Sequence, residues 1–549
     1  MSDTYQLADQ FLYESSLKSD STTNISKNKR IVSVSDGNFP SYSSGIITYD
    51  VSSQLTGGKG FASLRDAYIA LPYVVTLKNT GAAAMAAAVN RFCVGLKTGV
   101  WNVVDSLALE INNQSVVTEG DYRLYANNIR AMTEWSQNEV VKNGAEAFVY
   151  PDDWQSMSFS STAGTSGDGF TNNNTNTNGS VGLAPEGVQL AENTGFINRV
   201  TCNPQPVSAI ASNGTETAQR SSVSTTIAQQ NGKGAFVTTA AAAGQIAGTW
   251  YHMLKIRLVD LHPIFKELDL VGNPQIKLKL KINSGFCDIG TTSTTMTLTS
   301  TTMTSGNTVP VMIASAAASN AMNGVLSASA GSLRLAFGPL QNNLTPVYDI
   351  AAPTAIVSKP IKTVRYLETY AQYITKRAGT GAQTTQQNAS FAFQLSGSWK
   401  NIKTIALIPF SETTTCEQFQ SPFDTAPWTC QPGSAIKSFQ VQIGNENLFS
   451  KTVDYDFESF NDEFKKIGAI NGSITHEIAN GLIDAQKWAT VQRILVADCS
   501  RLSNKDVPQS VIVSGTNACC QGMNALVLVS YEKEIQIDRL TGECYVTTA

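Results

Sequence analysis

The sequence predicts an all-β protein in which two similar β-sandwiches follow one another, with long loop insertions and short helices. Short runs rich in β-branched and aromatic residues recur along both halves, separated by Gly, Asn and Thr. One sequence pattern typical of strand, turn and helix occurs twice, and the two copies are more than 300 residues apart. Two long segments with few charges interrupt the first half. These observations indicate one β design used twice, with large insertions in the first copy.

The composition sets the broad class of the protein. The chain has 549 residues, enough for two to four domains at roughly 150 residues each. Hydrophobic residues make up 42% and charged residues only 15%, against roughly 25% in an average soluble domain. The net charge of -4 gives no long-range attraction for nucleic acid or an acidic membrane, so strong direct nucleic-acid binding is not expected. A surface covered by neighbours and a neutral, hydroxyl-rich exterior explain the low charge equally well.

The cysteines and the N-terminus indicate the compartment. The nine cysteines form no C-x-x-C pair, so we expect free thiols in a reducing compartment and no zinc site. The N-terminus holds no apolar stretch typical of a signal peptide, and no run approaches the ~20 apolar residues of a membrane span. We therefore expect a soluble protein made in a cytosol.

Residues 1–35 are expected to be a flexible N-terminal arm because they are polar. Their first 30 residues carry four acids and four bases, which is not the composition of a basic, genome-binding arm. Leu7, Phe11 and Leu12 give only a weak sign of a short helix.

The two predicted sandwiches occupy residues 36–350 and 351–549, with roughly seven to nine strands each. In the first, a helix is predicted near 121–135 from the spacing of Tyr125, Ile129 and Met132. The predicted strands of the first are 67–77, 88–96, 103–111, 252–265, 274–283 and 333–340. Those of the second are 361–374, 391–397, 402–410, 436–443, 491–498, 509–515 and 524–538.

The two low-charge segments are predicted excursions from the first sandwich. Residues 155–249 contain seven charged residues, and 289–333 contain none. A structureless loop of 95 residues is unusual in a compact domain, so 155–249 is expected to hold some strands, for example near 236–248. The Thr, Ser and Ala of 289–333 suit a tightly packed edge or loop, for instance against another chain.

The repeated pattern aligns residues 107–128 with 439–461. Leu109-Glu110-Ile111 matches Val441-Gln442-Ile443, and Asp121-Tyr122 matches Asp454-Tyr455 after one inserted residue. Further on, Asp260 matches Asp498. The shared order of strand, turn, apolar pair, Asp-Tyr and helix favours a structural duplication over chance.

The sequence contains no recognisable catalytic, cofactor-binding or metal-binding motif. His252, His262 and His476 lack the surroundings of a catalytic or metal-ligating histidine, and we expect packing or surface roles for them. Lys59 in LTGGKGFAS does not fit a phosphate-binding loop. The carboxylates of DYDFESFNDEF are expected on the solvated face of a helix, and an Asp498–Arg501 contact is expected to stabilise a turn. No site residue and no cofactor is therefore predicted.

A series of stretches covers about 200 residues of the second half, among them IKTVRYLETYAQY, IKTIALIPF, SPFDTAPW, VQIGNENLF, DYDFESF, GLIDAQKW and ADCSRLSNKDVPQSVIVSGTN. In these stretches and their order the chain resembles the double jelly-roll major capsid proteins of icosahedral DNA viruses, the hexon-like lineage that includes polinton-like viruses. The first half contributes LKIRLVDLHPIFKELDL to this resemblance. The stretch NACCQGMNALV differs from the hydrophobic sequence that family members often have at this place.

The resemblance implies a major capsid protein, a structural subunit of the virion and not an enzyme, made in the host cytoplasm. It implies two eight-stranded jelly rolls side by side, and homotrimers of pseudo-hexagonal outline that tile the shell. Residues 155–249 are then a tower on the outer face, and 289–333 add to a second tower or to trimer contacts. The implied partners are neighbouring capsomers, penton and minor capsid proteins, and an internal membrane reached through the N-terminal arm.

Three other classes stay open. A single jelly-roll coat protein of an RNA virus, with a protruding domain, is disfavoured by the balanced N-terminal charge. A β-sandwich adhesin or lectin-like protein would bring a secretion signal or an anchor. A jelly-roll enzyme would bring His and carboxylate ligands.

Overall fold

The computed structural model describes most of the two sandwiches and part of the insertions. With a few short gaps inside them, the described ranges are 29–34, 41–50, 61–82, 92–120, 125–151, 208–211, 219–220, 236–237, 243–301, 311–315, 322–331, 343–348, 359–374, 389–412, 436–470, 481–490, 493–499, 507–518 and 522–546.

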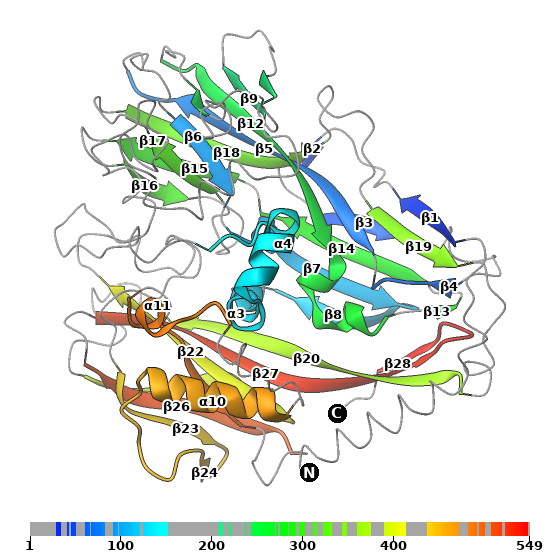
Figure 1. Cartoon of the computed structure of the whole chain (residues 1–549), viewed down its shortest axis with the longest axis vertical. Helices are drawn as coiled ribbons and strands as arrows, with labels where there is room; N and C mark the ends of the chain where they lie inside the picture. The colour runs from blue at the N-terminus through cyan, green and yellow to red at the C-terminus, as the bar shows by residue number, and fades with distance from the viewer. Residues whose placement is uncertain are drawn as a thin grey trace.

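The second half forms a sandwich of two antiparallel sheets (Figure 1). One sheet has the order β20–β27–β22–β25, with β28 beside β27, and the other has the order β21–β26–β23–β24. Counted along the chain, strands 1, 8, 3 and 6 share one sheet and strands 2, 7, 4 and 5 share the other, which is the jelly-roll arrangement. The strands are β20 (Ile361–Ile374), β21 (Ser390–Trp399), β22 (Ile402–Glu412), β23 (Ile436–Ile443), β24 (Glu446–Asn447), β25 (Leu495–Asp498), β26 (Gln509–Asn517), β27 (Gly522–Asp538) and β28 (Cys544–Val546).

The first half repeats this strand order. Strands β1, β19, β5 and β12 pair in that sequence, and β3–β14–β7–β8 form the facing sheet. The strands are β1 (Lys29–Val34), β3 (Ile46–Asp50), β5 (Tyr68–Asn79), β7 (Val104–Ile111), β8 (Gln114–Glu119), β12 (Ile246–Arg257), β14 (Ile276–Ile282) and β19 (Asn343–Tyr348), with the short strands β2 (Ser41–Tyr42), β4 (Phe61–Ala62) and β13 (Val271–Gly272) at the edges. The predicted all-β fold of two jelly rolls in tandem is therefore confirmed.

The repeated sequence pattern folds into the same hairpin in both sandwiches. In the first, β7 and β8 place Ile111 opposite Gln114. In the second, β23 and β24 place Ile443 opposite Glu446, so the sequence offset and the structural offset agree. A helix follows each hairpin, α3 (Tyr125–Glu134) after the first and α10 (Phe457–Ile470) after the second.

The first sandwich carries an additional body of strands, which we call the upper sheet. Strands β5 and β12 continue beyond the sandwich into a sheet of order β10–β9–β12–β5–β18–β15–β16, and β11–β6–β17 form a smaller sheet near it (Figure 1, top). Both low-charge segments contribute strands to these sheets. The added strands are β6 (Phe92–Leu96), β9 (Ser208–Ala211), β10 (Gln219–Arg220), β11 (Phe236–Val237), β15 (Gly285–Thr291), β16 (Met296–Thr301), β17 (Val311–Ser315) and β18 (Met322–Gly331).

Some predicted boundaries differ from the structure. Strand β1 lies inside the predicted arm and pairs with β19, so the first sandwich begins before residue 36. The remainder of the arm, 1–28, lies outside the described residues, as does the predicted strand 333–340. The strand expected over 252–265 ends at Arg257, because the chain then turns through α8 (Leu258–Leu261) and η4 (Pro263–Lys266). Asp260 consequently lies in a helical turn, whereas Asp498 ends strand β25.

Short helices connect the strands of both sandwiches. Helix α4 (Gln137–Ala147) follows α3 and begins with a capping box, in which Ser136 and Glu139 satisfy each other's backbone N–H groups. The 3-10 turn η1 (Val100–Val103) precedes β7, and α11 (Ala485–Thr490) precedes β25. Helix α10 packs against β25, and its Phe460 is fully buried.

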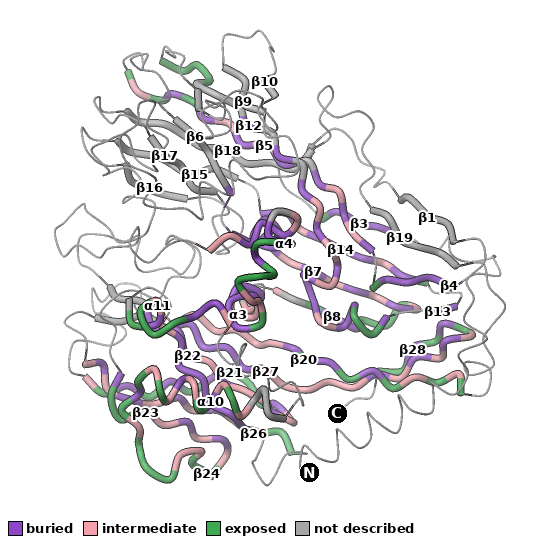
Figure 2. Tube along the Cα trace, viewed as in Figure 1, coloured by how far each residue is buried: buried purple, intermediate pink, exposed green. Residues whose placement is uncertain are grey.

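The hydrophobic core is continuous across both sandwiches. Alternate residues of β5, β7 and β14 are buried, as the period of a strand requires. The central part of β27, from Ala525 to Val529, is buried on both faces. Figure 2 shows the buried strands of the second sandwich lying below those of the first. One connected cluster of apolar side chains spans the boundary between them.

Candidate functional site

The described residues contain no group of three or more His, Cys, Asp or Glu side chains that could hold a metal ion. Within that same part of the chain, no helix has the length and apolar character needed to cross a bilayer. Lys59, His476 and Arg501, all considered in the sequence analysis, lie outside the described residues. The remaining candidates are His252, His262 and the carboxylates near α10.

His252 is buried in β12, opposite Tyr73 of β5. Neither ring nitrogen has a hydrogen-bond partner within the described structure. Burial lowers the pKa of His252 to about 4, so the ring is neutral at pH 7. Its position in the core agrees with the predicted packing role.

The carboxylates of residues 454–463 have structural partners. Asp454 Oδ1 accepts a hydrogen bond from Ser438 N at 2.9 Å, and Asp456 Oδ1 caps α10 by accepting from Ser459 N at 2.8 Å. The hydrogen bonds from Ser459 lower the pKa of Asp456. Glu463 departs from the predicted solvated face, because it is buried and accepts from Asp498 N at 2.8 Å.

The most distinctive arrangement is the contact between the two sandwiches, which we call the seam. It joins β20, β27, β28 and residues 481–484 of the second half to β8, β13, α3 and η4 of the first. Strands β20 and β27 are long because they continue past their own sandwich and lie along the first one (Figure 1). The inner face of this extension, including Val364, Tyr366 and Ile535, is buried.

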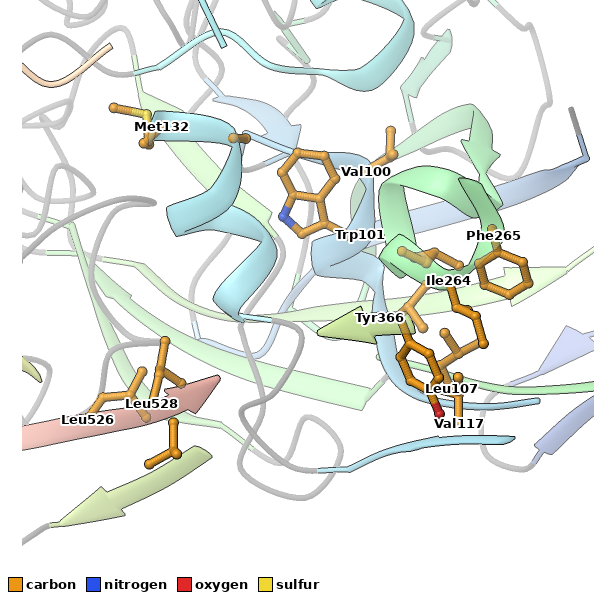
Figure 3. Packing of buried hydrophobic residues seen from close by; sticks show 14 of the residues in the cluster. Val100, Trp101, Leu107, Val117, Met132, Ile264, Phe265, Tyr366, Leu526 and Leu528 are labelled. Carbon is orange, nitrogen blue, oxygen red and sulfur yellow. The ribbon is translucent and has the colours of Figure 1, made fainter. Parts of the chain in front are cut away.

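Tyr366 anchors the centre of the seam. Its hydroxyl donates to Val116 O of β8 at 2.8 Å, and Figure 3 shows its ring directed toward Leu107 and Val117. Burial raises the pKa of the Tyr366 phenol, so it remains a hydrogen-bond donor at any physiological pH.

Beside Tyr366 the seam contains a buried charged group. Glu368 is fully buried, and its Oε2 lies 3.3 Å from Lys533 Nζ of β27. Its Oε1 lies 3.8 Å from Nε2 of His262, a residue of the first sandwich. The His262 ring also meets the Tyr366 ring edge-on, with 5.6 Å between centroids. A buried carboxylate requires such partners, because its transfer from water is otherwise very unfavourable.

Backbone hydrogen bonds fasten the ends of the seam. Gly272 N donates to Arg539 O at 2.7 Å, and Leu482 N donates to Met132 O at 2.7 Å near the end of α3. At the edge, Lys362 Nζ contacts Glu267 Oε2 at 3.0 Å. These contacts hold the two sandwiches together at both ends of the seam.

No local pattern in the sequence predicts the seam. The strand 361–374 is predicted with its observed boundaries, but its Glu368 was not recognised as a buried residue. The donor and acceptor of the Tyr366–Val116 bond are 250 residues apart, beyond the range of any local pattern. An ionisable residue at an inward position of a strand was the available signal.

Comparisons with known proteins give likenesses of structure only. No family model matches the sequence, and no curated protein matches it significantly. The structure is similar to a chain of the Sputnik virophage (TM-score 0.45, 11% identity, 95% of this chain and 89% of that chain covered) and to the mavirus major capsid protein (0.43, 11%, 95% and 92%). It is also similar to a chain of the PBCV-1 virus capsid (0.38, 8%, 96% and 98%). The strand order, rather than these distant likenesses, establishes the double jelly roll.

Proposed function

We propose that this chain is the major capsid protein of an icosahedral DNA virus, a structural subunit of the virion. The observation that carries the proposal is the presence of two jelly rolls of identical strand order in one chain, fixed side by side by a buried seam. Three such chains in a closed ring present six similar sandwiches. This ring has the outline needed to tile a shell in hexagonal contact with its neighbours.

The same observation disfavours a single jelly-roll coat protein with a protruding domain, because the second half is itself a complete jelly roll. Jelly rolls also occur in lectins and in metal-dependent enzymes of the cupin type. Those activities need a sugar-binding or metal-binding site, and the buried ionisable groups of the seam are instead engaged between the sandwiches.

In this proposal the first jelly-roll unit includes β1 and runs to residue 350, the second unit is 351–549, and an arm lies within residues 1–28. The upper sheet, with 155–249 and 289–333, is the tower on the outer face, where hydroxyl-rich and weakly charged surface suits contact between three copies. The proposed partners are two further copies of the chain, neighbouring capsomers, penton and minor capsid proteins, and an internal membrane reached by the arm. The polinton-like type of the lineage is proposed from the resemblance of the sequence.

The test is the assembly state of the purified full-length chain. Light scattering after size-exclusion chromatography should give three times the 58.8 kDa chain mass, and negative-stain images should show particles of hexagonal outline. The chain should also be the most abundant protein of purified particles. A folded chain that stays monomeric at high concentration, without hexagonal particles, would contradict the proposal.

A further inference from the structure

The β7–β8 hairpin of the first sandwich is covered by the second sandwich. Val116 and Val117 of β8 are 3% and 0% exposed. Tyr366 of β20 lies over them, with its hydroxyl on Val116 O and its ring directed toward Val117 (Figure 3). The apolar pair of this hairpin is therefore buried by the β20–β27 ribbon of the seam.

The cover extends from the hairpin strand to the hairpin turn and the segment beside it. At the turn, Asn112 Nδ2 donates a hydrogen bond to Gly542 O of the second sandwich. In the segment before β14, Gly272 N donates to Arg539 O at 2.7 Å. The hairpin and this segment together form the side of the first sandwich that faces the seam.

The second sandwich has the same hairpin, and there the corresponding apolar pair is more exposed. At the offset that relates the two hairpin turns, this pair is Leu448 and Phe449, directly after β24. Both side chains are only partly buried. The hairpin of the second sandwich thus lacks the cover that buries its counterpart in the first.

The segment beside the second hairpin also carries an exposed apolar residue. Gly272 lies four residues before Ile276 and Val507 four residues before Val511, and these two pair with corresponding residues of β7 and β23. Val507 is therefore the counterpart of a seam residue, yet it is 60% exposed. We call Leu448, Phe449 and Val507 the open surface.

The strands that cover the first hairpin have counterparts in the first sandwich. In the pairing order of their sheets, β1 and β19 hold the places that β20 and β27 hold in the second. β27 runs past Ile402, the first residue of β22, and β19 runs past Tyr68, the first residue of β5, and each stays paired with its partner strand. Figure 1 shows β1 and β19 on the opposite side of the molecule from β24, so they cannot reach the open surface of their own chain.

We propose that the open surface binds the β1–β19 ribbon of a second copy of this chain, as the β20–β27 ribbon covers the β7–β8 hairpin within one chain. This inference rests on the proposed function, because it names the surface through which copies of the capsid subunit join. The contact is head to tail, since each copy offers the ribbon of its first sandwich and the open surface of its second. Head-to-tail contacts close into a ring when the repeated rotation completes a full turn. Three copies then alternate three seams with three contacts of the same kind.

A charge placed on the open surface tests this contact. Val507→Lys should leave the unfolding temperature of the dilute, dissociated chain unchanged, because the side chain is exposed there. In the assembly the new charge would face a ribbon in which β1 begins with Lys29 and Arg30, and like charges across an interface oppose association. The protein concentration at half-assembly, measured by light scattering over a dilution series, should rise roughly tenfold or more.

Val141→Lys is the matched control, because Val141 is 72% exposed on α4, away from both proposed surfaces. It should leave the concentration at half-assembly unchanged. A wild-type chain that forms trimers, together with a Val507→Lys variant that assembles equally well, overturns the inference and leaves the proposed function standing. A wild-type chain that stays monomeric contradicts both.

Photo-cross-linking identifies the partner segment. With benzoylphenylalanine in place of Val507, illumination of the assembled protein should give a band at twice the 58.8 kDa chain mass. Mass spectrometry of the digested band should join residue 507 to peptides from 29–34 or 343–348 of another copy. A cross-link to any other segment, or none between copies of the assembled protein, overturns the inference.

Discussion

The two sandwiches share one strand order but have lengthened different parts of it. In the first, the connections between strands are long, and they build the upper sheet. In the second, two strands of the sheet itself are long, β20 with 14 residues and β27 with 17 residues, and they build the seam. The jelly-roll core thus tolerates additions both at its loops and at its strand ends. The additions at the loops of the first sandwich form a further sheet, and those at the strand ends of the second contact the neighbouring sandwich.

A single added methyl group at Gly481 should disrupt the seam. Gly481 has φ +61°, and a Cβ atom there would lie 2.3 Å from Met132 O and 2.5 Å from Thr133 O of α3. We expect Gly481→Ala to cost about 3–5 kcal/mol, since the clash is with backbone that cannot move aside. Denaturant unfolding monitored by tryptophan fluorescence measures the loss.

Gly244→Ala is the matched control, because Gly244 has φ +79° but open space around it. It should cost only about 1 kcal/mol, from backbone strain alone. Equal losses for the two variants would show that α3 and the 481–484 segment are not in close contact.

The first sandwich should respond to acid through His252. The folded protein keeps this ring neutral down to a pKa of about 4, whereas an unfolded histidine binds its proton near pH 6.5. The associated stability is complete above pH 6.5 and is lost as the pH falls to about 4, roughly 3 kcal/mol in all. His252→Phe should remove this part of the pH dependence. Parallel stability curves for the wild type and the variant between pH 7 and pH 4 would rule this out.

The duplicated Asp-Tyr pair tests how far the structural similarity of the two sandwiches extends beyond the hairpin. Tyr455 OH donates to Val496 O at 2.6 Å and accepts from Val496 N at 2.9 Å, which ties the segment before α10 to β25. Tyr455→Phe should cost about 1–2 kcal/mol because both Val496 groups are buried. If the duplication extends past the hairpin, Tyr122→Phe should cost the same amount in thermal or denaturant unfolding. A neutral Tyr122→Phe would limit the duplication to the hairpin and the helix.

Replacement of a long segment of the insertion should have the smallest effect on the stability of the sandwiches. Replacing residues 160–240 by a short Gly/Ser linker leaves the pairing of β5 with β12, from Ile246 opposite Lys78 onward, intact. The stability of the sandwiches should then change by less than about 1 kcal/mol. Deleting residues 457–470, which are fewer, should abolish folding, because Phe460 of α10 is fully buried. Failure of the 160–240 deletion to fold would show that this segment belongs to the core.

The sequence predicted elements whose pattern is local. The strand 361–374 and the strand 436–443 have their predicted boundaries, because alternation of apolar and polar residues is visible within each. The predicted helix after each repeated hairpin is also present. Glu463 was missed as a buried residue, although its spacing from Phe460 and Ile467 places it on the apolar face of α10.

Elements that depend on distant partners were not predictable in this way. Asp260 was matched with Asp498 because the surrounding sequences are similar. In the structure, however, strand β12 ends before Asp260, and His262 and Pro263 begin a new turn just after it. The burial of Glu368 depends on His262 and on the packing of β20 against the first sandwich, which no stretch of sequence specifies. The same holds for the continuation of β5 and β12 from the sandwich into the upper sheet.

That continuation has a mechanical consequence. Strands β5 and β12 pair in regular register from Tyr68 opposite Arg257 to Leu77 opposite Gly248, with a shift only before Ile246, so one antiparallel ladder runs from the sandwich into the upper sheet. A pull on the upper sheet along these strands loads many hydrogen bonds in shear at once, instead of opening them one by one like a zipper. A force applied to the outer end of the upper sheet is therefore transmitted along β5 and β12 to the core of the first sandwich.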